Sequence, residues 1–393
     1  MADTVWAVLH HQQELVQRLP VEAFRNAVPN EGHLLAAALL YEGALNCVMT
    51  LNFNLAFSHA LRVLGAEDVS VIEGPADYGN LGLVNLIYLH RSANADYEEW
   101  ILRTDALNNQ WHGNWQGVVA ARFLASPVTV FAGLGARATV LIETTRRIRD
   151  AVTAAGVAVY QIDPVDRAHS AFFAALEIPD ASYIQMGWCE FMTELAGHVC
   201  DAQIARLSVA CNEQLVSEHL PHEDVPGLSQ KVRALGLLGL GAARARWRLS
   251  DRPYLPHHPA EDLLFADLVL TVGLVERTIG GAAIFSRDGV VEFRHAERLL
   301  GVALLASGRG VRGWSALEAK IRASDDHWRY RNPRPRHAIV SGVQGQRPAT
   351  TAPPLTLTAE AEPGSILFGD EEIQMLAAIE LRADPTRATA ILG

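Results

Sequence analysis

Lysine is almost absent from this chain, which contains Lys231 and Lys320 and no other lysine. A phosphate-binding P-loop requires a Gly-Lys-Ser/Thr run, and neither lysine stands in one. The chain is therefore not a self-contained ATPase of the P-loop kind.

Cysteine is also scarce, and its spacing excludes a familiar kind of metal site. The four cysteines are Cys47, Cys189, Cys200 and Cys211, and no two of them form a Cys-x-x-Cys pair. This spacing argues against a structural zinc ribbon, and we expect no bound metal. A chain of this length has no need of a disulfide framework.

Long apolar runs and excess positive charge are missing as well. Residues 1–19 contain no apolar signal core, and the longest apolar stretches, such as Leu263–Val275, are interrupted by charge and too short for a bilayer. The formal net charge is −11, so direct binding to nucleic acid or anionic lipid is not expected. We expect a cytoplasmic protein that does not contact the membrane.

The first half alternates between apolar runs typical of strands and segments with helical periodicity. Such alternation predicts an α/β fold, with a Rossmann-type parallel sheet and helices on both faces. The expected strands are 44–50, 69–73, 83–89, 127–132, 157–162 and 182–186, and the expected helices are 34–41, 55–64, 136–154 and 168–176.

The pattern changes at Trp188, and a helical region follows. Its expected helices are 191–216, 230–246, 260–279 and 295–305. After Asp325 the chain becomes rich in arginine and proline, 345–354 looks like a linker, and 355–393 adds a strand and a helix at 371–381. The expected domains are 1–187, the helical region 188–324, and 325–393 as a basic arm, linker and C-terminal segment.

Three groups of residues follow expected strands, where ligands bind in parallel α/β sheets. Thr50 and Asn52 could bind a ribose or an amide, or they could cap the next helix. His90 could act as a general base near neutral pH, or it could be an ordinary polar residue at a strand end.

The third group is a Gly-x-Gly-x-x-Ala run that begins at Gly133 and Gly135, between an expected strand and an expected helix. Its glycines would let a pyrophosphate approach the helix N-terminus, and Asp163 at the end of the next strand could bind a ribose hydroxyl. The spacing from Gly135 to Asp163 is longer than usual for such a motif. The alternative is an ordinary strand–helix turn that needs glycine for packing.

Taken together, these groups resemble the sirtuin family over about residues 32–199. Sirtuins carry Thr-Gln-Asn-x-Asp after one strand and His-Gly after another, and here Thr50, Asn52 and His90 match the Thr, Asn and His. Bacterial antiphage members, such as Thoeris effectors and the sirtuin-like partners of HerA-type ATPases, resemble the chain more than the deacetylases do. Their turn after a strand is similar to Phe131–Gly135.

The sequence departs from the family at three places. Asn54 replaces the Asp, Arg91 replaces the Gly after the His, and no Gly-Ala-Gly-x-Ser phosphate loop precedes Leu45. Either the chain begins late, or another segment or subunit supplies the phosphate-binding wall of the NAD site, or tight NAD binding has been lost.

The resemblance implies a nicotinamide-releasing NAD⁺ glycohydrolase of a bacterial antiphage defence system, with Asn52 and His90 as catalytic residues and NAD as the substrate. Thr50, Gly133, Gly135 and Asp163 would contact the NAD. The main alternative is a catalytically inactive sirtuin-like subunit that serves assembly or nucleotide sensing. A weaker alternative is a Rossmann oxidoreductase that uses 133–163.

We also expect partners. The apolar surface of the helical region and the arginines of 329–336, which have few local acids to pair with, indicate a homo-oligomer. The resemblance adds a possible HerA-type ATPase as a second partner.

Overall fold

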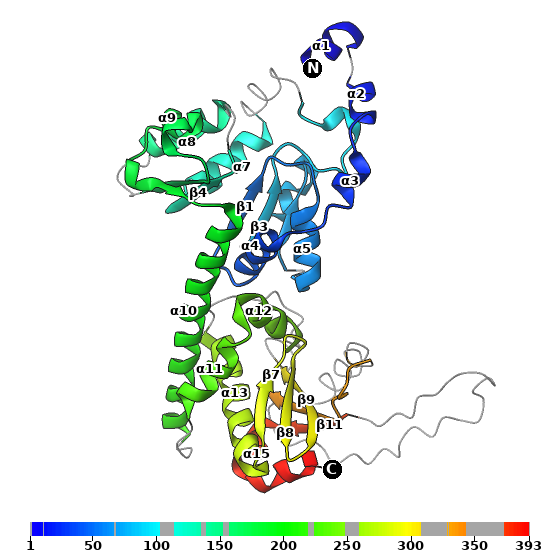
Figure 1. The fold of residues 1–393 in the computed structure, drawn as a ribbon, viewed down its shortest axis with the longest axis vertical. Helices are drawn as coiled ribbons and strands as arrows, with labels where there is room; N and C mark the ends of the chain where they lie inside the picture. Colours follow the sequence, from blue (N-terminus) through cyan, green and yellow to red (C-terminus); the bar gives the residue numbers. More distant parts are fainter. Residues whose placement is uncertain are drawn as a thin grey trace, which may run out of the picture. The chain divides into compact units, whose positions relative to one another are not determined.

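The computed structural model of the protein describes residues 2–10, 12–66, 68–102, 114–134, 139–151, 157–218, 224–247, 259–307, 328, 330–342 and 373–392. The chain divides into two compact units, residues 1–199 and 200–393. The division falls inside the long helix α10 (Trp188–Ser217), which is green in Figure 1.

The first unit contains two small sheets, and every strand in them is parallel to its neighbours. One sheet has the order β1-β3-β2 and the other has the order β4-β5-β6. The strands are β1 (Cys47–Thr50), β2 (Ser70–Ile72), β3 (Asn85–Tyr88), β4 (Val128–Ala132), β5 (Ala158–Asp163) and β6 (Tyr183–Gln185). All six lie where the sequence predicts strands, and the α/β class is confirmed.

Helices precede and connect these strands, and local side chains explain where several of them begin and end. The Asn30 side chain accepts a hydrogen bond from His33 N at the start of α4, and Gly65 ends α5 with a φ of 66°. The helices are α1 (Ala2–Leu9), α2 (Gln13–Gln17), α3 (Val21–Arg25), α4 (Glu31–Tyr41), α5 (Ala56–Leu64), α7 (Trp115–Leu124), α8 (Thr139–Ala151) and α9 (Ala171–Leu176).

One hydrophobic core extends across both sheets. Ile72 and Ile87 of the first sheet belong to the same buried cluster as Phe131 and Val159 of the second. Helices α7, α8 and α9 add buried side chains to this cluster, which explains why two short sheets are stable as one unit.

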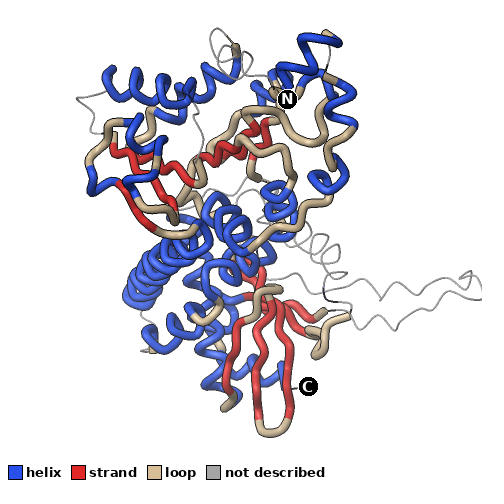
Figure 2. Tube along the Cα trace, turned by 45° about the horizontal axis from the view of Figure 1, so that its top comes forward, coloured by secondary structure: helices blue, strands red, loops and turns tan. Residues whose placement is uncertain are grey.

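The second unit is a five-stranded sheet with helices against it. The order is β11-β10-β9-β8-β7, in which β7, β8 and β9 are antiparallel while β9, β10 and β11 are parallel. Figure 2 shows these strands side by side. The strands are β7 (Ala282–Phe285), β8 (Val290–His295), β9 (Arg298–Ala306), β10 (His337–Ser341) and β11 (Gln374–Ala377).

The helices of the second unit surround the apolar helix α13, which packs against the sheet. Besides the end of α10, they are α11 (Val225–Arg233), α12 (Gly236–Trp247), α13 (Pro259–Ile279) and α15 (Ala378–Ala383). A 3₁₀ segment, η7 (Pro385–Leu392), also contacts α13. Within the described ranges, no helix has the length and apolar character that crossing a bilayer requires.

The prediction of a helix at 295–305 was wrong, because this segment forms the end of β8 and most of β9. Residues 301–306 of β9 are buried without alternation, since the strand lies in the middle of the sheet. A continuous apolar run of this kind cannot be told from a buried helix by periodicity. The expected helix 230–246 is two helices, because Gly236, the first residue of α12, has a φ of 63° and so breaks the helix that ends at Arg233.

The expectation that Arg331 has few acids nearby was also wrong. Its Nε donates to Asp288 Oδ2 at 2.5 Å and its Nη2 donates to Glu292 Oε1 at 2.6 Å. Only 11% of its side chain is exposed, so Arg331 holds its own segment against β8. It therefore no longer supports the prediction of an oligomer.

Candidate functional site

The first candidate site lies at the carboxyl ends of β1 and β3, which are neighbours in the first sheet. Thr50 is opposite Tyr88 in the parallel register, and Leu89 N donates to Thr50 O at 3.0 Å just beyond the strands. Neighbouring strands lie about 4.8 Å apart, so the two loops leave the sheet side by side. This pairing brings Asn52 and His90 to one edge.

His90 is tied to the opposite loop through its ring. The imidazole forms a hydrogen bond with the backbone of Leu51, and this bond raises the pKa, which identifies the Leu51 carbonyl as the acceptor. Burial acts in the other direction and dominates, lowering the pKa of His90 to about 4. The ring is therefore neutral at pH 7, and one of its two nitrogens carries no proton.

Asn52 lies between two contacts that join the loops. On one side is the bond between His90 and Leu51, and on the other Ala93 N donates to Phe53 O at 2.8 Å. The backbone N–H of Asn52 donates to Thr50 Oγ1 at 3.1 Å, and the Asn52 side chain is exposed. Thr50 thus shapes the turn, while the side chain of Asn52 is left exposed.

Asn54 has a structural role at the end of this loop. Its Oδ1 accepts a hydrogen bond from Ala56 N at 3.2 Å, at the start of α5. A short polar side chain at this position organises the turn into the helix. The N-cap of α5 is Leu55, and no side chain caps this helix, so Asn54 forms a turn before the helix and the capping alternative does not apply to Thr50 or Asn52.

Arg91, directly after His90, has a backbone conformation that favours glycine. Its φ is 73°, in the left-handed region that glycine occupies without strain. Its Nη1 donates to Glu73 O at 3.1 Å and its Nη2 pairs with Glu99 at 2.8 Å. Gly74 makes room for this guanidinium, because a Cβ there would overlap Nη1. Arg91 therefore anchors the loop after His90.

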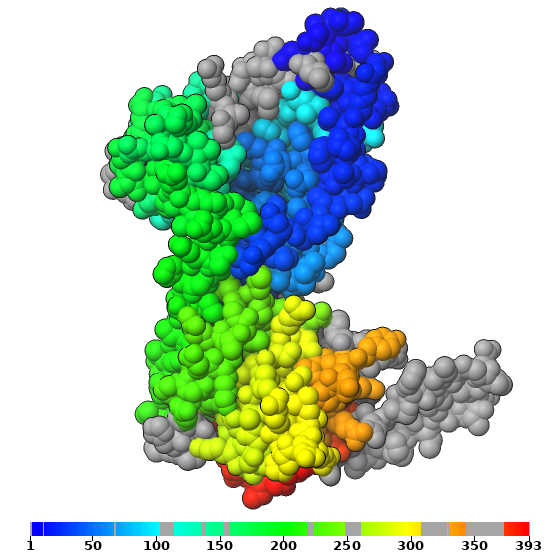
Figure 3. Space-filling view, viewed as in Figure 1, coloured from blue at the N-terminus to red at the C-terminus, as the bar shows by residue number. Residues whose placement is uncertain are grey.

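Two stacked aromatic rings help to hold the loops at this edge of the sheet. The rings of Phe53 and Trp100 are 4.5 Å apart and nearly parallel, and Trp100 is only 2% exposed. Gln12 Nε2 donates to the carbonyls of Tyr97 and Trp100, both at 2.7 Å. The N-terminal segment, dark blue in Figure 3, thereby fixes the loop that follows His90. No pattern in the sequence indicates this role of Gln12.

The second candidate site lies at the ends of β4 and β5. The register pairs Ala132 with Ile162, so the next residues, Gly133 and Asp163, are neighbours. Gly133 has a φ of 66° with open space beside it, whereas Asp163 is 7% exposed and its Oδ1 accepts from Val165 N at 3.0 Å. Gly135 lies outside the described residues.

The two predicted sites are not brought together by a shared sheet. Asn52 and His90 are on the β1-β3-β2 sheet, and Gly133 and Asp163 are on the β4-β5-β6 sheet. What they share is the core, since Leu51 and Leu134, each next to its predicted site, pack against the same buried cluster.

The segment before β1, where the sequence analysis looked for a phosphate loop, is helical. Residues 2–10 and 12–46, as far as the structure describes them, contain the helices α1 to α4 and no strand. A strand–turn–helix phosphate loop therefore does not precede β1 among them.

Within the described ranges, no group of three or more His, Cys, Asp or Glu side chains is arranged to hold a metal ion. Comparisons of this chain with protein-family models, with curated proteins and with solved structures gave no match.

Proposed function

We propose that the protein is a nicotinamide-releasing NAD⁺ glycohydrolase whose site lies at the ends of β1 and β3. The observation that carries the proposal is the parallel pairing of β1 with β3, because it makes His90 and the exposed Asn52 follow neighbouring strands at one edge of the sheet. An amide and a neutral imidazole at the carboxyl edge of a parallel sheet suit a ribose and its attacking water.

The reaction requires little covalent chemistry from the protein. Water attacks C1′ of the nicotinamide ribose, the bond from C1′ to the nicotinamide nitrogen breaks, and its electron pair neutralises the charge on the ring. Asn52 positions the ribose or the water, and the free nitrogen of His90 takes the proton that the water loses and later releases it to solvent. Positioning therefore contributes most of the rate.

The alternative is a catalytically inactive sirtuin-like subunit for assembly or nucleotide sensing. Two observations favour it. No phosphate loop precedes β1 among the described residues, and Arg91 is fixed by Glu73 and Glu99 next to His90. An antiphage role, a homo-oligomer and a HerA-type ATPase partner are further proposals that rest on the sirtuin resemblance and the exposed apolar surface expected from the sequence.

Nicotinamide release from NAD⁺ tests the proposal. Chromatography should detect nicotinamide with the wild type, and the variants His90→Ala and Asn52→Ala should each lower the rate by at least 100-fold, a typical contribution of a general base. His169→Ala and Asn80→Ala are matched controls, since both side chains are exposed and lie outside this edge.

Binding of NAD⁺ separates the two candidates. A wild type that binds NAD⁺ but releases no nicotinamide supports the inactive subunit. Near wild-type turnover in His90→Ala or Asn52→Ala would refute the assigned roles.

A further inference from the structure

A cavity of about 500 Å³ lies in the second unit, far along the sequence from Asn52 and His90. It forms where the carboxyl ends of β10 and β11 meet the end of α10 and the middle of α13. Ligands of α/β sheets bind at this edge of parallel strands. Its polar lining includes Glu213, Gln214, Glu218, Asp267, Ser341 and Arg382.

The lining of the cavity is acidic. Glu213, Glu218 and Asp267 oppose one guanidinium, that of Arg382, which leaves a formal excess of two negative charges. Arg382 already has two acidic partners in the protein: its Nε donates to Glu218 Oε2 at 2.8 Å, and its Nη1 forms an ion pair with Asp267. The cavity therefore favours a cation over an anion.

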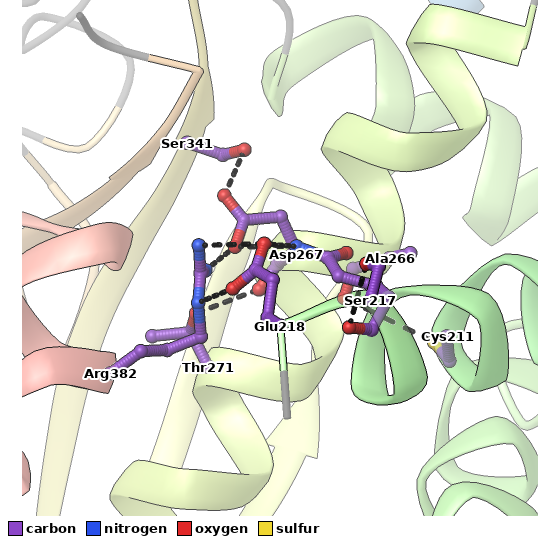
Figure 4. A network of polar contacts seen from close by, with 9 residues as sticks. Cys211, Ser217, Glu218, Ala266, Asp267, Thr271, Ser341 and Arg382 are labelled. Carbon is purple, nitrogen blue, oxygen red and sulfur yellow. Dashed lines mark hydrogen bonds and ion pairs between the residues drawn. The ribbon is translucent and has the colours of Figure 1, made fainter. Parts of the chain in front are cut away.

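Figure 4 shows how these groups are fixed, with the guanidinium of Arg382 in contact with the carboxylates of both Glu218 and Asp267. Ser341 donates to Asp267 Oδ2 at 2.5 Å, and both residues are buried. Directly after Ser341, Gly342 has a φ of 76°, and a Cβ there would lie 2.6 Å from Ser307 Oγ. The network is thus held rigidly by the end of β10, which preorganises the wall of the cavity.

Gln214 supplies an observation that is independent of the charges. It lines the cavity and is 8% exposed, and its Nε2 donates to Glu218 Oε1 at 3.1 Å. Its Oε1 is buried and has no hydrogen-bond partner among the described residues. Buried hydrogen-bond acceptors are nearly always paired, so this unpaired oxygen indicates that a hydrogen-bond donor is missing.

The remaining walls are apolar and include Leu264, Val340 and Ile379. We propose that the cavity binds a small organic cation, an amine or a guanidinium with a hydrocarbon portion. Its N–H groups donate to Gln214 Oε1 and to the Glu213 and Glu218 carboxylates, and its hydrocarbon portion lies on the apolar walls. The same chemistry is offered by a free amine and by an arginine side chain of another protein.

Calorimetric titration of the full chain with agmatine, spermidine and N-acetylarginine amide tests this proposal, with phosphate and NAD⁺ as anionic probes. Agmatine or spermidine should bind and the anions should not bind here. Comparison with N-acetylarginine amide distinguishes a free cation from a protein side chain. Gln214→Leu should weaken binding about tenfold, the value of one hydrogen bond to a charged group.

Glu213→Gln should weaken the same binding about threefold, since its carboxylate is exposed. Glu297→Gln, at an exposed position in the turn between β8 and β9, is the matched control and should change nothing. If no cationic probe binds at millimolar concentration, the proposal is wrong. It is equally wrong if Gln214→Leu and Glu213→Gln both bind as the wild type does, or if phosphate binds and Arg382→Gln abolishes that binding.

Discussion

The substitution Gly74→Ala tests how the loop after His90 is anchored. Gly74 has a φ of −167°, an extended conformation that alanine also adopts, so the change adds no backbone strain. The new Cβ would instead overlap the Arg91 guanidinium and displace it from Glu73 O and Glu99. Any loss of stability therefore reports on this one contact.

The magnitude follows from the two interactions that are lost. The hydrogen bond from the guanidinium to the Glu73 carbonyl contributes ~1.5–3 kcal/mol, and the ion pair with the half-exposed Glu99 contributes less than ~1 kcal/mol. Because Nη1 is the far end of a flexible side chain that can shift and regain water, we expect a net loss of about 1 kcal/mol. For a unit of this size, that lowers Tm by roughly 2–4 °C.

Urea unfolding followed by tryptophan fluorescence measures this loss. Gly79→Ala is the matched control, since a Cβ at Gly79 meets nothing within 4 Å among the described residues. In the double variant Gly74→Ala/Arg91→Gly there is no guanidinium to displace, so the two changes should be strongly non-additive. Equal effects of Gly74→Ala and Gly79→Ala, or an additive double variant, would refute the reasoning.

Three further predictions concern other parts of the chain. The pKa of His90 falls to about 4 in the folded state, so the unfolded chain binds more protons than the folded chain between pH 4 and 6.5. The free energy of unfolding should therefore drop as pH falls through this window. In denaturant titrations, His90→Gln should make this dependence on pH weaker. Trp100→Ala should cost ~3–5 kcal/mol, because it empties a buried site against Phe53; a loss below 1 kcal/mol in urea unfolding would contradict the packing. Arg331→Glu should destabilise the second unit by about 2 kcal/mol, because the new carboxylate repels Asp288 and Glu292. The mass measured by light scattering should not change. Dissociation of an oligomer without loss of stability would instead support the prediction that this arginine holds an oligomer together.

The strands of the first unit were predictable because each is a short apolar run followed by a polar or glycine-containing turn. Thr50, Asn52 and His90 stand directly after two such runs, so their shared edge followed from the parallel sheet. The pairing of β1 with β3, rather than with β2, was not predictable from periodicity. Neither was the bond between His90 and Leu51, which depends on that pairing.

The second unit was harder to predict, because its central strand β9 has the composition of a buried helix. The cavity was missed for a related reason. Its lining comes from four segments between residues 213 and 382, which no local pattern connects. One signal was present, since Asp267 interrupts the apolar run Leu263–Val275 of α13 and such a carboxylate needs buried partners.

The central claim is that His90, beside Asn52, contacts NAD⁺. Nuclear magnetic resonance of the labelled His90 ring during titration with NAD⁺ tests it most directly. We predict that the ring is neutral at pH 7, that its signals shift with NAD⁺, and that the shift disappears in Asn52→Ala. A His90 ring whose signals do not move at saturating NAD⁺, while those of residues near Gly133 and Asp163 do, would contradict the account.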